Sequence, residues 1–515
     1  MARLALLSVS DKTGIVDLAR QLVEEFEFEL ISSGGTAKKL QEAGLRVTKV
    51  SDYTGSPEIL GGRVKTLHPR IHGGILGRPN LPEDAAEMDS NQIRPLDLVV
   101  VNLYPFEKTI ARPNCTVTEA IENIDIGGPA MLRAAAKNFA SVTVVSNPKY
   151  YDRTLEELRL GSGKTTLEFR QKMAGETFAV TQAYDRAIAT YFASLNSQQE
   201  ELPPQYSVEG TVVQSLRYGE NPHQKASWYQ SGTQETGWAA ASKLQGKELS
   251  YNNLVDLEAA RRIIAEFDSS QPAAAVLKHT NPCGVGVGTT LAEAYEKAFN
   301  SDSISAFGGI VALNQPIDTN TARSLTKTFL ECVVAPGCES EAKEILAAKS
   351  KLRVLLLPDL QFGPKQAVKA IAGGFLVQAT DCLPDTPEEW QVVTQKQPTS
   401  QEMAELLFAW KVAKHVKSNA IVVTKNLATI GVGAGQMNRV GAAKIALEQA
   451  GDRSVGATLA SDGFFPFDDS VRTAAAAGIT AIVQPGGSVR DKDSIDAANE
   501  LGLVMVFSGI RHFLH

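Results

Sequence analysis

Lys278 and His279 are adjacent residues whose chemistry suits proton transfer. They follow the apolar run 273–277, which has the character of a buried strand, so we expect them at the end of that strand. A neighbouring ammonium group disfavours the charged imidazolium, which keeps the histidine available as a base near neutral pH. The pair therefore predicts acid–base chemistry at a strand end.

Glycine-rich segments near the N-terminus suit an anionic ligand. Residues 33–36 (SGGT) follow a predicted strand and open a predicted helix, so their backbone N–H groups can reach a phosphate at the positive helix end. Taken alone, the segment is also typical of a plain helix N-cap. Residues 61–69 (GGRVKTLHP) place two cations, a hydroxyl and a histidine in one loop, for which an exposed charged loop is the alternative.

Two further segments add a phenol, a carboxylate and a lysine. Tyr104 follows the continuous apolar run 96–102, which is typical of a parallel strand covered on both faces. Open α/β sheets bind ligands at the carboxyl edge, where we therefore expect Tyr104. Asp125 precedes a glycine turn that opens an alanine-rich helix containing Lys137. Together these groups suit acid–base work on an anionic ligand.

Three other motifs do not carry the chemistry that they suggest. Residues 163–165 (GKT) lack the glycine that a phosphate-binding P-loop needs at position 158. The glycine run 431–435 is not the GxGxxG of nicotinamide or flavin enzymes. Cys283 follows a proline as in zinc deaminases, but Gly286 replaces the second cysteine and no histidine begins HxE, so we expect no zinc.

Apolar runs that alternate with helical periods predict an α/β protein with a parallel sheet in its first part. The polar segment 196–204 ends in two prolines and predicts a boundary between a domain at 1–198 and a second at 205–515. Alternating glycines at 284–288 and 431–435 suggest two similar α/β subdomains in the second part. Ser-Asp pairs at 301–302 and 461–462 form a second echo, although their separation differs from that of the glycines.

The composition excludes several classes of protein. The 515 residues carry a net charge of −7, which argues against a general nucleic-acid coat. No apolar run approaches a membrane span. The five cysteines follow no disulfide framework, which favours a reducing compartment. We therefore expect a soluble, cytoplasmic protein with no nucleic-acid or membrane partner.

Taken in order, the motifs of the chain closely resemble the bifunctional purine-biosynthesis family of AICAR transformylase/IMP cyclohydrolase. They cover nearly the whole chain: SVSDKTG, SGGT, GGRVKTLHP, NLYPF, DIGGPAMLRAAAKN, LRYGENPHQ, LKHTNPCG, FGG, GAGQ, SDGFFPF and RHFLH. The resemblance implies a methylglyoxal-synthase-like N-terminal domain with its core at about 1–147. It also implies a C-terminal part of two cytidine-deaminase-like α/β subdomains without the catalytic zinc.

The resemblance implies the last two steps of IMP synthesis. A formyl group passes from 10-formyltetrahydrofolate, the co-substrate, to the 5-amino group of AICAR, and the product FAICAR then closes to IMP with loss of water. Family members are homodimers with transformylase sites at the subunit interface. A potassium ion near Asp462 is also implied.

Carried over by motif, the cyclohydrolase candidates for chemistry are Lys65, Tyr104, Asp125 and Lys137, with Lys137 expected to transfer a proton. The implied substrate-binding residues are Ser10, Asp11, Lys12, Ser33, Gly34, Gly35, Thr36, Arg63, Val64, Thr66, Val101, Asn102, Ile126, Gly127 and Gly128.

For formyl transfer the resemblance implies that His279 is the base, that Lys278 stabilises the transition state or protonates the departing folate nitrogen, and that Asn419 orients the groups. The implied AICAR-binding residues are Arg217, Tyr218, Phe307, Gly308, Glu331, Arg511 and Phe513. The implied folate-binding residues are Arg439, Phe464, Pro466, Asp469, Ser488 and Val489.

Glu331 and Ser470 depart from the Asp and Asn of vertebrate members, which affects binding contacts rather than the reaction. Two rival functions remain. One is a zinc-type nucleobase or nucleotide hydrolase, which the missing metal ligands disfavour. The other is a non-catalytic nucleotide-binding regulator, which has no need for a paired acid and base.

Overall fold

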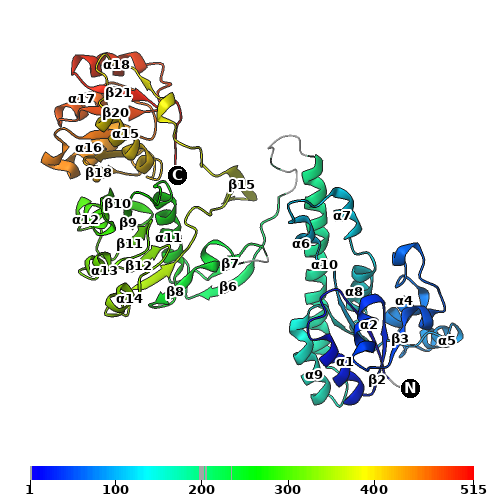
Figure 1. Ribbon diagram of the computed structural model, residues 1–515. Coiled ribbons are helices and arrows are strands. Elements are labelled where there is room, and N and C mark those ends of the chain that lie inside the picture. Colours follow the sequence, from blue (N-terminus) through cyan, green and yellow to red (C-terminus); the bar gives the residue numbers. More distant parts are fainter. Residues whose placement is uncertain (1–2, 197–201, 203–205, 233–234) are drawn as a thin grey trace. The chain divides into compact units, whose positions relative to one another are not determined.

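The computed structural model describes residues 3–196, 202, 206–232 and 235–515 (Figure 1). The chain forms two compact units, Met1–Tyr206 and Ser207–His515. Residues 197–201, 203 and 204 of the predicted boundary segment lie outside the described residues.

The first unit contains a five-stranded parallel sheet in the order β3-β2-β1-β4-β5. Its central strands are almost wholly apolar and are buried on both faces, as the predicted run at 96–102 requires. The strands are β1 (Arg3–Val9), β2 (Phe28–Ser32), β3 (Val47–Lys49), β4 (Leu98–Asn102) and β5 (Thr143–Val145).

Helices cover both faces of this sheet and enclose two apolar cores. The strand order reverses between β1 and β4, and ligands of open α/β sheets bind at the carboxyl edge of such a switch point. The helices are α1 (Ile15–Glu24), α2 (Gly34–Glu42), α3 (Val50–Thr54), α4 (Pro69–Leu76), α5 (Pro82–Ser90), α6 (Phe106–Ile110), α7 (Val117–Glu122), α8 (Gly127–Lys137), α9 (Tyr151–Leu160) and α10 (Leu167–Asn196), with 3₁₀ turns at Leu60–Gly62 and Pro148–Tyr150.

The second unit contains two six-stranded mixed sheets with the same topology. The first has the order β10-β9-β11-β12-β13-β8 and the second β18-β17-β19-β20-β21-β16, and corresponding neighbours pair with the same parallel or antiparallel sense. The first comprises β8 (Ser242–Gln245), β9 (Ala273–Lys278), β10 (Asn281–Val287), β11 (Ile310–Leu313), β12 (Cys332–Ala335) and β13 (Arg353–Leu356). The second comprises β16 (Gln391–Val392), β17 (Ile421–Thr424), β18 (Thr429–Gly433), β19 (Thr458–Ser461), β20 (Ala481–Gln484) and β21 (Val504–Phe507).

The helices of the two subdomains also correspond in order along the chain. In the first they are α11 (Tyr251–Ile264), α12 (Leu291–Ser301), α13 (Thr319–Leu325) and α14 (Ser340–Ala347). In the second they are α15 (Ser400–Ala413), α16 (Arg439–Ala450), α17 (Asp469–Ala476) and α18 (Asp491–Glu500). The 3₁₀ turns are Gly237–Ala240, Pro387–Glu389 and Gly451–Ser454. The two predicted α/β subdomains are therefore confirmed.

Close packing of a helix on a strand explains the glycine echo. A methyl group at Gly284 would lie 2.0 Å from the Ala298 carbonyl oxygen of α12, and one at Gly431 would lie 1.9 Å from the Ala446 carbonyl oxygen of α16. The predicted correspondence of the two Ser-Asp pairs is wrong, because Ser301 ends helix α12 whereas Ser461 ends strand β19.

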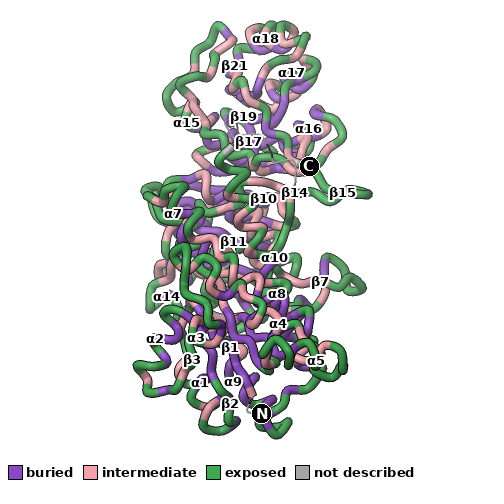
Figure 2. Tube along the Cα trace, turned by 90° about the vertical axis from the view of Figure 1, so that its right-hand side faces the viewer, coloured by how far each residue is buried: buried purple, intermediate pink, exposed green. Residues whose placement is uncertain are grey.

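The two subdomains meet where β10 lies against β18. The Val285 N–H donates to the Thr429 hydroxyl at 2.9 Å, and Gly286 forms a bridge with Ala428. Two hairpins lie outside the large sheets: β6 (Thr211–Leu216) with β7 (Ala226–Gln230), and β14 (Gln366–Ile371) with β15 (Gly374–Ala379). Figure 2 shows β15 as an exposed segment.

Candidate active sites

In the first unit, two lysines flank the N-terminus of α2 at the carboxyl edge of the sheet. A methyl group at Gly34 would lie 3.0 Å from Lys65 Nζ, and one at Gly35 would lie 3.6 Å from Lys12 Nζ. Gly34 has a φ of +52°, a conformation that glycine adopts without steric cost. Two ammonium groups and a helix N-terminus therefore meet where SGGT was predicted to bind phosphate.

The strand ends at this edge are tied together by side chains. The Asn102 amide oxygen accepts the N–H groups of Ser10 and Asp11 at 2.6 and 2.9 Å, and its nitrogen donates to the Asp11 carbonyl at 2.9 Å. The Thr36 hydroxyl donates to the Val9 carbonyl at 2.9 Å. Ser33, the N-cap residue of α2, lies 3.2 Å from the Ser8 hydroxyl. The side chains of Asn102 and Thr36 thus fix the loops that surround the site.

Asp125 and Tyr104 form the acid–base part of this edge. The Gly128 N–H donates to Asp125 Oδ1 at 2.8 Å, and the Asp125 N–H donates to the Tyr184 hydroxyl at 2.8 Å. Burial raises the pKa of Asp125, and the hydrogen bonds from the Gly128 and Tyr104 N–H groups partly oppose that rise. Burial and the nearby Asp125 charge raise the pKa of Tyr104, so the phenol stays protonated and able to donate.

The 61–69 loop joins the same group. Thr66 is buried, and its hydroxyl would lie 2.5 Å from a methyl group at Gly127. Lys65 forms an ion pair with Glu58 at 3.5 Å, and the exposed Arg63 forms one with Glu122. Val64 and Ile126 are exposed, as a binding surface requires.

Two predicted residues of the first unit take no part in the contacts above. Lys137 is the exposed last residue of α8, and the helix separates it from Gly127 by roughly 15 Å along its axis. Its expected role in proton transfer stays a prediction. The side chain of Val101 is 1% exposed within the apolar core, so only its backbone is left for a ligand.

In the second unit, Lys278 ends β9 and His279 stands exposed in the turn between β9 and β10. Lys278 Nζ donates to the Phe307 carbonyl at 2.8 Å and would lie 3.3 Å from a methyl group at Gly308. Glu331 lies beside this segment, because its N–H donates to the Gly309 carbonyl at 3.0 Å. The predicted Lys-His pair therefore lies at a strand end beside three predicted AICAR-binding residues.

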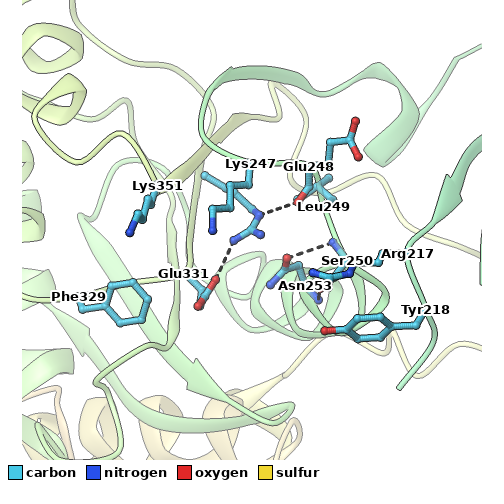
Figure 3. A pocket seen from close by; sticks show the side chains of 11 residues that line it. Arg217, Tyr218, Lys247, Glu248, Leu249, Ser250, Asn253, Phe329, Glu331 and Lys351 are labelled. Carbon is cyan, nitrogen blue, oxygen red and sulfur yellow. Dashed lines mark hydrogen bonds and ion pairs between the residues drawn. The ribbon is translucent and has the colours of Figure 1, made fainter. Parts of the chain in front are cut away.

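A large pocket of about 680 Å³ adjoins this strand end (Figure 3). It contains the predicted Arg217, Tyr218 and Glu331, with the Arg217 guanidinium 5.6 Å from the Tyr218 ring centre. Arg353 donates to Glu331 Oε2 at 2.7 Å and to the Glu248 carbonyl at 2.8 Å. The other lining residues are Lys247, Leu249, Ser250, Asn253, Phe329 and Lys351. The basic lining suits an anionic ligand such as a nucleotide.

The second subdomain contributes a buried network around Asp462. Ser418 donates to Asp462 Oδ2 at 2.5 Å, the Ala420 N–H donates to Oδ1 at 3.1 Å, and Arg439 forms an ion pair with Oδ1. Arg439 Nη2 also donates to Asn419 Oδ1 at 2.8 Å. The sequence had predicted that Arg439 binds folate. Arg439 is only 7% exposed, however, and its side chain orients Asn419.

The same network engages both carboxylate oxygens of Asp462. One oxygen binds Arg439 and a backbone N–H, and the other binds the Ser418 hydroxyl. A potassium ion near Asp462 would therefore need other oxygen ligands, such as backbone carbonyls. Among the residues that the structure describes, no group of three or more His, Cys, Asp or Glu side chains is arranged to hold a metal ion.

The C-terminal tail passes along this network. The His512 N–H donates to the Asp462 carbonyl at 3.2 Å, and a methyl group at Gly463 would lie 2.7 Å from the Phe513 ring. The Arg511 guanidinium stacks 4.4 Å from the centre of that ring. The turn of His279 reaches the same region, because Asn281 donates to the His279 carbonyl and accepts the Lys417 N–H.

The other predicted folate residues lie on two loops of the second sheet. Phe464, Pro466 and Val489 are exposed, and Ser488 accepts the Arg490 N–H at 3.1 Å. Asp469 begins α17 and bonds to its neighbour Ser470. The amide oxygen of the buried Gln484 accepts the N–H groups of Phe465 and Gly486 at 3.3 Å each, which holds the two loops together.

Sequence reasoning missed Asn102 as a loop clamp, and it missed Tyr184, Arg353 and Gln484. Tyr184 comes from the distant α10, and Gln484 is the last residue of strand β20, so no local motif marks either residue. Arg353 follows a lysine-rich segment, which is the only signal that its position offers.

Comparison with known proteins identifies the family of the chain. The model of the AICARFT/IMPCHase bienzyme family matches residues 135–449, and that of the MGS-like domain matches 14–130. "Bifunctional purine biosynthesis protein PurH" of Rippkaea orientalis is 76% identical over 516 residues, and that of Gloeothece citriformis is 76% identical over 517 residues. The Synechocystis protein of the same name is 69% identical over 515 residues. Each match covers 100% of both chains.

The chain belongs to the AICARFT/IMPCHase bienzyme family. It is a bifunctional enzyme of purine biosynthesis, an AICAR formyltransferase and IMP cyclohydrolase that catalyses the last two steps of IMP synthesis. The predicted methylglyoxal-synthase-like domain and the mixed α/β fold are confirmed. Within the described part of the chain, no helix has the length and apolar character to cross a membrane.

Proposed function

We propose that Met1–Tyr206 carries the cyclohydrolase reaction at the carboxyl edge of its sheet, and that Ser207–His515 carries formyl transfer at the end of β9. The observation that supports the first assignment is the meeting of Lys12, Lys65 and the α2 N-terminus. A nucleotide phosphate at this point binds to two ammonium groups and to the N–H groups of the first helical turn. Asp125 and Tyr104 then face the base.

In the cyclisation, the carboxamide nitrogen of FAICAR attacks the formamide carbon and the formamide oxygen becomes an oxyanion. Asp125 takes a proton from the attacking nitrogen, since its raised pKa suits a proton acceptor nearer neutrality. The protonated phenol of Tyr104 stabilises the oxyanion. Protonation of that oxygen and loss of the formamide N–H proton release water and leave IMP.

In formyl transfer, the 5-amino group of AICAR attacks the formyl carbon of 10-formyltetrahydrofolate, and His279 takes the proton of the amine. Lys278 has three N–H donors and gives one to the Phe307 carbonyl, which leaves the others for the oxyanion and for the departing folate nitrogen. Arg439 holds the side chain of Asn419, which orients the formyl group of 10-formyltetrahydrofolate. AICAR binds along Arg217, Tyr218 and Glu331, and folate along the loops that Gln484 holds together.

We also propose that the enzyme acts as a cytoplasmic homodimer. The β14–β15 hairpin carries Val368, Ile371, Phe375 and Leu376, which are 43–56% exposed. Apolar side chains at this density on an isolated hairpin are stabilised when a second surface covers them. All five cysteines are free, which suits a reducing compartment. Analytical ultracentrifugation tests the dimer, and a monomer at micromolar concentration would contradict it.

Paired variants test the division of labour. His279→Ala should abolish formyl transfer and leave the conversion of added FAICAR to IMP intact. Lys65→Ala should do the reverse and accumulate FAICAR from AICAR and 10-formyltetrahydrofolate. Lys38→Ala is the control. Lys38 lies on α2 with its side chain 79% exposed, and its loss should change neither reaction. Loss of both activities in either single variant would contradict the assignment.

A further inference from the structure

The turn that presents His279 has an unusual backbone. His279 and Thr280 have φ values of +51° and +65°, although neither residue is glycine. Residues with a side chain adopt this left-handed conformation rarely, and two in succession persist only where the surroundings fix them. The groups that hold this turn therefore determine where the imidazole of His279 lies.

Three side chains hold the turn. Asp256 Oδ1 accepts the Thr280 N–H at 2.8 Å. The Thr280 hydroxyl and the Asn281 amide donate to the His279 carbonyl at 2.7 and 3.3 Å. Thr280 and Asn281 are neighbours of His279 in the chain. Of the three side chains, only that of Asp256 comes from another element, the helix α11, which packs across β9 and β11.

The electrostatic surroundings of Asp256 point to the same turn. Burial raises the pKa of its carboxyl group, while the Thr280 hydrogen bond and the nearby His279 and Lys278 lower it. The other titratable groups that face it are the thiols of Cys283 and Cys332. Burial raises the pKa of each thiol to about 12, so both are neutral at physiological pH. The carboxylate thus faces the base His279, the ammonium of Lys278 and two uncharged thiols.

We infer that Asp256 is a positioning residue for formyl transfer, which fixes the His279–Thr280 turn and compensates the positive charge that His279 gains when it takes the proton of the AICAR amine. This inference rests on the proposed role of His279. Asp256 does not touch substrate in this account; it acts through the histidine.

Two variants separate the hydrogen bond from the charge. Asp256→Asn keeps an oxygen that accepts the Thr280 N–H but removes the charge, and we expect kcat for formyl transfer to fall roughly 10-fold. Asp256→Ala removes both, and misplacement of the imidazole should lower kcat on the order of 100-fold. In both variants the KM for AICAR should stay close to the wild-type value, because the pocket residues are untouched.

Asp268→Ala is the matched control. Asp268 Oδ1 accepts the Ser270 N–H at 2.7 Å in the exposed loop before β9, at the opposite end of that strand from His279. Its loss should leave both activities unchanged. Conversion of added FAICAR to IMP by the same samples shows that each preparation holds active enzyme. Asp256→Asn, which has nearly the shape of the wild type, decides the question if Asp256→Ala is insoluble.

A kcat for Asp256→Asn equal to that of the wild type would overturn the inference, as would a rise in KM without a fall in kcat. An equal fall in kcat in Asp268→Ala would overturn it as well. His279→Ala is measured in parallel. If His279→Ala kept formyl transfer, the proposed function would fail; if it lost the reaction while Asp256→Asn kept full rate, only the present inference would fail.

Discussion

Asp125→Asn tests the cyclohydrolase chemistry with little change of shape. The asparagine oxygen still accepts the Gly128 N–H that Asp125 binds at 2.8 Å, so the loop keeps its anchor. Loss of the charge on that bond costs about 1 kcal/mol. Loss of a general base costs about 10²- to 10⁴-fold in rate. At about 1.4 kcal/mol per factor of ten, the chemical effect is roughly 3–5 kcal/mol and exceeds the structural one.

The assay follows IMP formation from added FAICAR between pH 5 and pH 9, with formyl transfer by the same sample as the control for folding. Burial raises the pKa of Asp125, so the wild-type rate should rise with pH through a value above 3.8, and the variant should lack that limb. The raised pKa means that the folded state holds this proton more tightly than the unfolded state. Its contribution to stability is therefore complete at low pH and is lost as pH rises through the folded-state pKa. A variant within tenfold of the wild type at every pH would refute the role of Asp125 as base.

Two further predictions concern single glycines. Gly34→Ala places a side chain at a φ of +52°, which costs about 1–2 kcal/mol, and the added methyl group pushes on Lys65. The KM for FAICAR should therefore rise about tenfold, and an unchanged KM would count against the phosphate site. Gly431→Ala brings a methyl group to 1.9 Å from the Ala446 carbonyl oxygen, and urea unfolding should show a loss of about 3 kcal/mol; an unchanged midpoint would refute the packing argument.

Much of the first unit follows from local sequence. The apolar runs of β1 and β4 predict buried parallel strands, and the segments that follow them lie at the carboxyl edge, as predicted. The position of Lys137 at the far end of α8 from Gly127 also follows from local sequence, because an α-helix of 11 residues separates its ends by roughly 15 Å.

The roles of several residues were beyond sequence reasoning because long-range pairing decides them. Arg439 carries a charge that suits folate, but Asp462, 23 positions later, binds it in the interior. Asn102 stands at the right edge for a ligand, but its amide is used to hold the loop after β1. Such pairs depend on the packing of separate elements, and neither periodicity nor spacing encodes them.

The central claim is that two separate sites in one chain perform two consecutive reactions. A mixture of the Lys65→Ala and His279→Ala proteins, supplied with AICAR and 10-formyltetrahydrofolate, tests it most directly. Neither protein alone should form IMP, because the first stops at FAICAR and the second never makes it. The mixture should form IMP, with one tetrahydrofolate for each IMP. No IMP from the mixture, although the first protein releases FAICAR and the second converts it when added, would contradict the account.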